Sequence, residues 1–161
     1  YIRHPARWNI VLDNMRRYNE ALPWSVSAQP TPQAYNFYGL LELAKFCDAN
    51  GFTFTLNNVL HGPRYLSFEI LPESIINEGI LEWETYRRSS CRPELVAEVD
   101  TIIGALQQPR PADIERLQDE FIRFTNDLDK SRSQSFAQAN PRLYQRLVEE
   151  GFRFENKFRY S

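Results

Sequence analysis

The sequence predicts an α/β fold followed by a helical extension, within one compact domain of 161 residues. Two observations support this prediction. Helical and strand-like patterns alternate over residues 1–71, and long amphipathic helical patterns fill residues 72–161. A chain of this length buries enough apolar surface for one core.

The first helix and strand occupy residues 1–29. Apolar residues at helical spacing predict a helix over 5–21, and Pro23 ends it. Strict alternation then predicts a strand over 24–29. Its apolar face carries Trp24, Val26 and Ala28, and its polar face carries Ser25, Ser27 and Gln29.

The second helix and strand follow at once. Thr31 is a suitable N-cap with Pro32 at the first helical position, and Gly51 is a suitable helix stop. Polar and apolar residues alternate again over 52–57, with Phe52, Phe54 and Leu56 on the apolar face. A helix that joins two such strands predicts a parallel, right-handed β-α-β unit.

Polar groups at the predicted strand ends suggest a ligand site. Buried parallel strands are usually apolar on both faces, yet each of these strands keeps a polar face. Asn57 and Asn58 end the second strand, and ligands of α/β folds bind beyond the carboxyl ends of such strands. The alternative is that both Asn residues simply tolerate a turn backbone.

His61 follows the second strand and precedes Gly62-Pro63. With an ordinary pKa near 6.5, an imidazole there is a candidate general base or hydrogen-bond partner of a ligand. A purely structural histidine in a turn is the alternative. The apolar run Tyr65–Leu71 beyond it predicts an edge strand or extended segment.

The extension contains four helical patterns, over 72–88, 92–108, 111–132 and 140–151. Gly79 weakens the first of them. The third carries a regular apolar stripe of Ile114, Leu117, Phe121, Phe124 and Leu128. Such a stripe packs on its own domain or docks a partner helix.

Composition excludes several classes of function. The net charge of −2 gives no support to a nucleic-acid or anionic-membrane partner, and no apolar run approaches the roughly 20 residues that span a bilayer. Cys47 and Cys91 have no second ligand at metal-binding spacing, which predicts no metal site in this chain. Two reduced thiols fit a cytoplasmic protein. No catalytic motif is complete, so we assign no catalytic residue.

Three stretches resemble one protein family. They are "WSVSAQPTPQAYNFYGLLELAKFCDANGF" followed by "TFTLNNVLHGPRYLSFEILPESI", then "EFIRFTNDLDKSRSQSF", then "NPRLYQRL". In this order they resemble the last third of radical S-adenosylmethionine proteins of the uncharacterised group that carries a "twitch" iron–sulfur subdomain. The resemblance covers most of residues 24–148.

This resemblance implies the C-terminal part of a partial (β/α) barrel, with α-β-α-β plus an edge strand before the helical extension. The C-x-x-x-C-x-x-C loop that binds the [4Fe–4S] cluster is absent from the chain. S-adenosylmethionine and the cluster are therefore implied only for a longer parent protein, and this chain is expected to be inert alone. The residues expected to face the barrel mouth, as one wall of the cofactor and substrate site, are Ser25, Ser27, Gln29, Asn57, Asn58 and His61.

The start of the sequence and the uncovered edge of the predicted sheet both indicate that the chain associates with another polypeptide. Tyr1 begins the sequence and the only methionine, Met15, lies in a helical pattern, so we expect the chain to be part of a longer protein. An uncovered strand edge invites association. We therefore expect a homo-oligomer, pairing with the missing N-terminal half, or a tail that folds over the sheet. The alternative function is a freestanding α/β interaction module that docks a partner through its C-terminal helices.

Overall fold

The computed structural model of the chain describes residues 7–23, 25–56 and 62–155. The α-helices are α1 (Trp8–Ala21), α2 (Phe37–Asn50), α3 (Glu73–Ser89), α4 (Val96–Leu106), α5 (Ile114–Arg132), α6 (Phe136–Ala139) and α7 (Pro141–Glu149). The strands are β1 (Ser27–Ala28) and β2 (Thr53–Phe54). Short 3₁₀ helices are η1 (Ala34–Asn36), η2 (Arg64–Leu66), η3 (Phe68–Ile70) and η4 (Pro93–Leu95).

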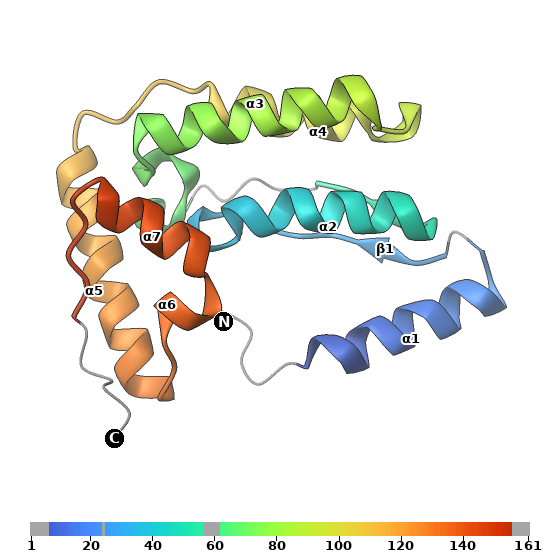
Figure 1. Cartoon of the computed structure of the whole chain (residues 1–161), viewed down its shortest axis with the longest axis horizontal. Coiled ribbons are helices and arrows are strands. Elements are labelled where there is room, and N and C mark those ends of the chain that lie inside the picture. The colour runs from blue at the N-terminus through green and yellow to red at the C-terminus, as the bar shows by residue number, and fades with distance from the viewer. Residues whose placement is uncertain (1–6, 24, 57–61, 156–161) are drawn as a thin grey trace.

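Helix α2 lies at the centre of this arrangement (Figure 1). It contacts β2, α3, α7 and η1. Helices α3 and α4 run together along one flank of α2, and α5, α6 and α7 gather at one end. Helix α1 lies on the other side of α2 and β1, apart from the rest.

The prediction of a partial (β/α) barrel is wrong, because the described part of the chain is mostly helical. Its sheet has two strands of two residues each, paired in parallel with Ser27 beside Thr53 and Ala28 beside Phe54. The β-α-β unit was correctly located and its strands are parallel. Alternation of polar and apolar residues extended over six residues in each predicted strand, but a strand lasts only as long as a neighbouring backbone can pair with it.

The predicted edge strand over Tyr65–Leu71 is also wrong. This run forms η2 and η3 instead, and both turns bury their apolar side chains against the helices. The Ser67 hydroxyl accepts a hydrogen bond from the Glu69 backbone N–H at 3.3 Å, which caps η3. A local side-chain cap of this kind offers the backbone an alternative to a strand.

The helices of the extension begin and end close to the predicted positions. Helix α2 starts later than expected, because Gln33 caps η1 and reciprocal bonds with Asn36 replace the predicted Thr31 cap. Gly51 ends α2 in the left-handed conformation, with φ of 69°, as its position predicted. The apolar stripe of α5 faces the core: Leu117 and Phe121 are buried, and Phe124 packs beside them.

Gly79 has a packing role that its helical position did not reveal. A Cβ added there would overlap Cζ of Phe37 and lie 3.0 Å from Cε1. Phe37 begins α2, and its ring is buried against α3. The glycine therefore allows α2 and α3 to approach at this point.

We expect Gly79→Ala to destabilise the chain by about 1–3 kcal/mol, because the buried ring must shift. Gly104→Ala in α4 is the matched control, since a Cβ there meets nothing within 4 Å. That substitution should instead stabilise by up to about 1 kcal/mol through helix propensity. Urea unfolding of both variants measures the difference, and an equal effect at the two glycines would contradict this role.

A buried hydrogen bond ties η1 to α5. Thr125 donates its hydroxyl proton to the Phe121 carbonyl at 2.7 Å, so Tyr35 donates to Thr125 Oγ1, also at 2.7 Å. Both residues are buried, and burial raises the pKa of Tyr35 above its usual value. Removing the acceptor leaves a phenol without its partner in the core.

Thr125→Val should therefore cost more stability than Tyr35→Phe. We expect about 1–3 kcal/mol for the valine, which removes the hydrogen bond between the Tyr35 hydroxyl and Thr125, and about 1 kcal/mol for the phenylalanine, which leaves Thr125 bonded to Phe121. Thr125→Ser retains the hydroxyl and serves as control. Thermal unfolding of the three variants gives the order, and a costlier Tyr35→Phe would reverse the assigned donor.

Candidate functional site

The polar face of the two-stranded sheet contains the described part of the predicted site. Ser25, Ser27 and Gln29 are exposed, while Val26 and Ala28 are half-buried and pack against the core. On β2, Phe54 is buried and Thr53 is exposed. The predicted alternation of faces is thus confirmed. Asn57, Asn58 and His61 lie outside the described residues.

The register brings polar groups of both strands together. Ser27 lies beside Thr53 in the parallel pair, and paired residues present their side chains on the same face. Hydroxyl groups line this face, with the Gln29 amide at its end. The surface offers hydrogen bonds and no formal charge, which suits a polar ligand better than an ionic one.

Side chains bind the backbone on both sides of β2 at its outer edge. Arg92 donates from Nη2 to the Phe52 carbonyl at 3.2 Å, and the Leu56 N–H donates to Glu98 Oε2 at 2.9 Å. Asp48 positions Arg92 through an ion pair and accepts a second hydrogen bond from Tyr86 at 2.8 Å. The Phe52 carbonyl and the Leu56 N–H, which flank β2, are therefore satisfied without a third strand.

The outer edge of β1 is open. The N–H groups of Thr53 and Thr55 donate to the carbonyls of Val26 and Ala28, at 2.9 and 3.0 Å. In a parallel ladder the residue between these two, Ser27, directs its N–H and C=O to the opposite side. No described residue pairs with them. This edge is the place where a further strand can join the sheet.

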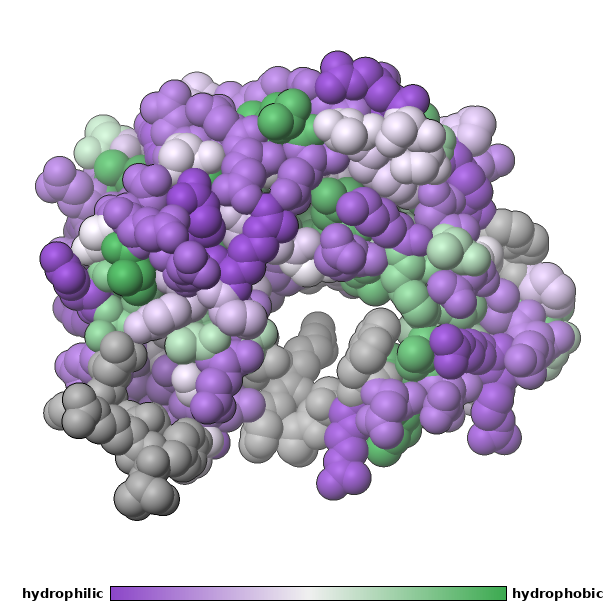
Figure 2. All heavy atoms as spheres, in the orientation of Figure 1, coloured by the Kyte–Doolittle hydropathy of each residue, from purple (hydrophilic) through white to green (hydrophobic). Residues whose placement is uncertain are grey.

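A cleft of about 600 Å³ separates the open edge from α1. Ser25 and Val26 form one wall, and the other is the apolar stripe of α1, which we define as Val11, Met15, Tyr18 and Leu22. Tyr18 and Leu22 are 70% and 65% exposed. Apolar side chains in a stripe that packs on its own domain are mostly buried, so these two residues are uncovered. In Figure 2 hydrophobic residues border the opening between α1 and the body of the molecule.

The largest charged cluster has a structural explanation. Glu78 of α3 pairs with Arg142 and Arg146 of α7 and accepts a hydrogen bond from Tyr38 of α2 at 3.2 Å. Burial opposes ionisation of Glu78, but these hydrogen bonds prevail and lower its pKa. Arg142 also covers the Tyr38 ring, 3.7 Å from its centroid. The cluster fastens α7 to α2 and α3.

No group of His, Cys, Asp and Glu side chains suited to a metal ion occurs within the part of the chain that the structure describes. Among the same residues, no helix is long and apolar enough to cross a membrane. No protein-family model, curated protein or solved structure matches the chain.

Sequence reasoning located the polar face but missed the groups that close β2. Arg92 precedes a proline in a loop and Glu98 lies in an ordinary amphipathic helix. Nothing in either local pattern indicates the distant backbone group that the side chain binds, since Arg92 and Phe52 are 40 positions apart and Leu56 and Glu98 are 42 apart. Only the tertiary structure, which places η4 and the start of α4 beside β2, brings them together.

We expect Arg92→Met to destabilise the chain by about 1–3 kcal/mol, because it leaves the half-buried Asp48 carboxylate without its cation and the Phe52 carbonyl without its donor. Arg87→Met is the control. Arg87 pairs with Asp100 at 2.6 Å, but both side chains are more than 40% exposed, so its loss should lower the urea midpoint far less than the loss of Arg92 does. Equal midpoints in urea for the two variants would contradict the closing role of Arg92.

Proposed function

We propose that the chain is a non-catalytic part of a radical S-adenosylmethionine-type protein. In this proposal it joins its small parallel sheet to a cluster-binding polypeptide part and supplies one wall of the cofactor and substrate site. The observation that carries the proposal is the open outer edge of β1 beside the α1 stripe, of which Val11, Tyr18 and Leu22 are exposed. The resemblance over residues 24–148 supports the chemistry assigned to the other part.

The physical argument begins with the sheet. Parallel sheets are almost always covered on both faces, and a pair of two-residue strands is too small to stand alone. Here α2 covers one face, side chains close the β2 edge, and the β1 edge is unpaired. Addition of a strand at Ser27 would pair its backbone groups and bring apolar surface against Val11, Met15 and Leu22.

In this proposal the polar face of the sheet becomes one wall of a ligand site. Once a neighbouring strand extends the sheet, Ser25, Ser27 and Gln29 line a crevice whose opposite side belongs to the docked part. Their hydroxyl and amide groups suit the hydroxyl, amino and carboxylate groups of S-adenosylmethionine or of a polar substrate. The iron–sulfur cluster is assigned to the docked part, and the protein to the cytoplasm, where Cys47 and Cys91 remain reduced.

Docking through the α5 stripe is less well supported. Leu117 and Phe121 pack inside the chain's own core and are not accessible to a partner in the folded protein. The described tail does not cover the sheet either. Phe152 and Phe154 lie against each other, and the Phe154 ring lies 5.3 Å from that of Phe136 in α6.

The first measurement is to read the coding DNA around the codon for Tyr1. An in-frame C-x-x-x-C-x-x-C motif within about 50–250 codons, the size range of one domain, would supply the expected other part. The complex of that part with this chain should bind iron and cleave S-adenosylmethionine. The isolated chain should bind neither iron nor S-adenosylmethionine. Tight binding of S-adenosylmethionine by the isolated chain would contradict the proposal.

A matched pair of variants then tests the docking surface. Leu22→Asp changes the α1 stripe and Leu81→Asp changes α3, at residues that are 65% and 60% exposed. Neither should unfold the chain, but only Leu22→Asp should weaken association with the cluster-binding part, by about tenfold or more. If sedimentation instead shows a dimer of the isolated chain that Leu22→Asp dissociates, the cleft belongs to a second copy and the proposal fails.

A further inference from the structure

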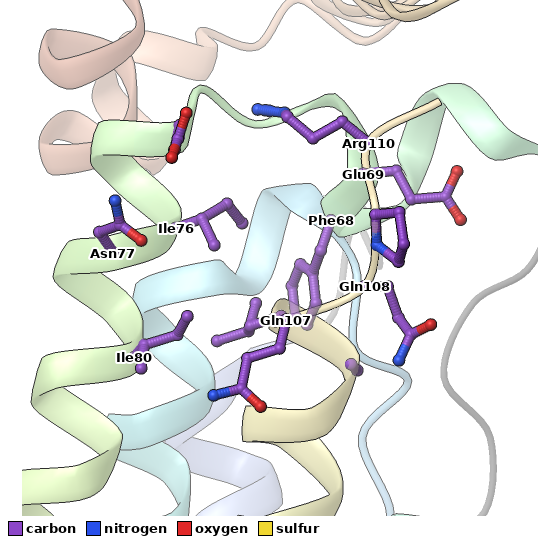
Figure 3. Close-up of a pocket in the computed structure, with 12 residues that line it drawn as sticks. Phe68, Glu69, Ile76, Asn77, Ile80, Gln107, Gln108 and Arg110 are labelled. Carbon is purple, nitrogen blue, oxygen red and sulfur yellow. The ribbon is translucent and has the colours of Figure 1, made fainter. Parts of the chain in front are cut away.

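A second pocket lies on the far side of α2 from α1, between α3, η3 and the segment that follows α4 (Figure 3). Its volume of about 530 Å³ is within the range of about 300–1,000 Å³ that small-molecule sites occupy. The apolar part consists of Phe68, Ile76, Ile80 and Leu106. Phe68 and Leu106 are core residues, so this part of the pocket is held by the fold.

Two opposite charges lie on the rim and attract each other without forming a close ion pair. Arg110 and Glu73 both line the pocket, and neither forms an ion pair or side-chain hydrogen bond with another described residue. In Figure 3 Arg110 extends over the mouth toward the start of α3, where Glu73 occupies the first turn. Glu69 also lines the rim, but Arg64 neutralises it through an ion pair at 3.2 Å.

The guanidinium of Arg110 is partly shielded from water. This shielding lowers the pKa of Arg110, and the negative charge of Glu73 opposes the effect. The guanidinium still carries N–H donors at the mouth of the pocket, and a ligand carboxylate can accept hydrogen bonds from them. Uncharged donors and acceptors stand nearby in the side-chain amides of Asn77 and Gln107.

The charges restrict the ligand. A simple organic anion would pair with Arg110 but would be repelled by Glu73, and a simple cation would meet the opposite conflict. A ligand that carries both charges on one carbon satisfies both side chains. The apolar part of the pocket requires a bulky hydrophobic group on the same molecule.

We propose that this pocket binds a free α-amino acid with a bulky apolar side chain. Its carboxylate pairs with Arg110, its ammonium group pairs with Glu73, and its side chain lies against Phe68, Ile76 and Ile80. This site is separate from the polar face of the sheet and from the α1 cleft. It does not depend on the proposed function.

The test is titration of the isotope-labelled isolated chain with L-phenylalanine, followed by backbone amide NMR. Saturable shifts should appear at Ile76, Ile80 and Leu106, with a dissociation constant of about 1 mM, typical of a small ligand in an open site. Three analogues provide the comparison: phenethylamine lacks the carboxylate, 3-phenylpropanoate lacks the ammonium group, and N-acetylphenylalanine amide lacks both charges. Each should bind about tenfold or more weakly than the amino acid.

Two variants test which charged group of the ligand each rim residue binds. Arg110→Gln should weaken L-phenylalanine about tenfold and leave phenethylamine unchanged or improved, because that analogue has no group for the guanidinium and is repelled by it. Glu73→Gln should weaken L-phenylalanine to a similar extent and leave 3-phenylpropanoate unchanged or improved. Both residues are exposed at the surface, so both variants should fold, which amide spectra without ligand would verify.

Three outcomes would overturn the proposal. They are the absence of saturable shifts at about 20 mM L-phenylalanine, equal binding of the uncharged analogue, and equal binding of L-phenylalanine by the parent chain and both variants. None of them affects the proposed docking at β1, which is measured with a different partner and through residues of α1.

Discussion

The close packing of α2 is the constraint on which the rest of the structure depends. Its side chains Phe37, Leu40, Leu41, Ala44 and Cys47 are all buried. Because α2 carries apolar residues around much of its surface, it must be covered on several sides, and β2, α3 and α7 cover it. The approach of α3 is possible only because position 79 has no side chain to meet the Phe37 ring.

The covering elements determine where the chain is closed and where it is open. Helix α4 packs on α3 and directs Glu98 to the edge of β2, and η4 is preceded by Arg92, which binds the same edge. The same α3–α4 pair leaves the pocket with Arg110 and Glu73 at its rim. No described element covers the other edge of the sheet in this way. Helix α1 faces that edge across a cleft, and its stripe keeps Val11, Tyr18 and Leu22 exposed while Met15 packs against the core.

The candidate docking surface and the amino-acid pocket differ in their physical character. The first is an unpaired backbone edge with an apolar wall, which suits a polypeptide strand. The second is a partly open apolar space with two opposite charges at its rim, which suits a small molecule. They lie on opposite sides of α2, so occupation of one leaves the other accessible.

The sequence by itself determined the positions of the helices, the helix stop at Gly51, and the alternation that exposes Ser25, Ser27 and Gln29 while it buries Phe54. These features depend on neighbours within a few residues, so local patterns reveal them. Tertiary structure alone decided that the sheet has two short strands, that Tyr65–Leu71 turns instead of extending, and that Arg92 and Glu98 close β2. It also placed Arg110 near Glu73. Strand pairing and pocket formation join residues far apart in sequence, and a local pattern specifies which residues are apolar but not which backbone or charge will lie beside them.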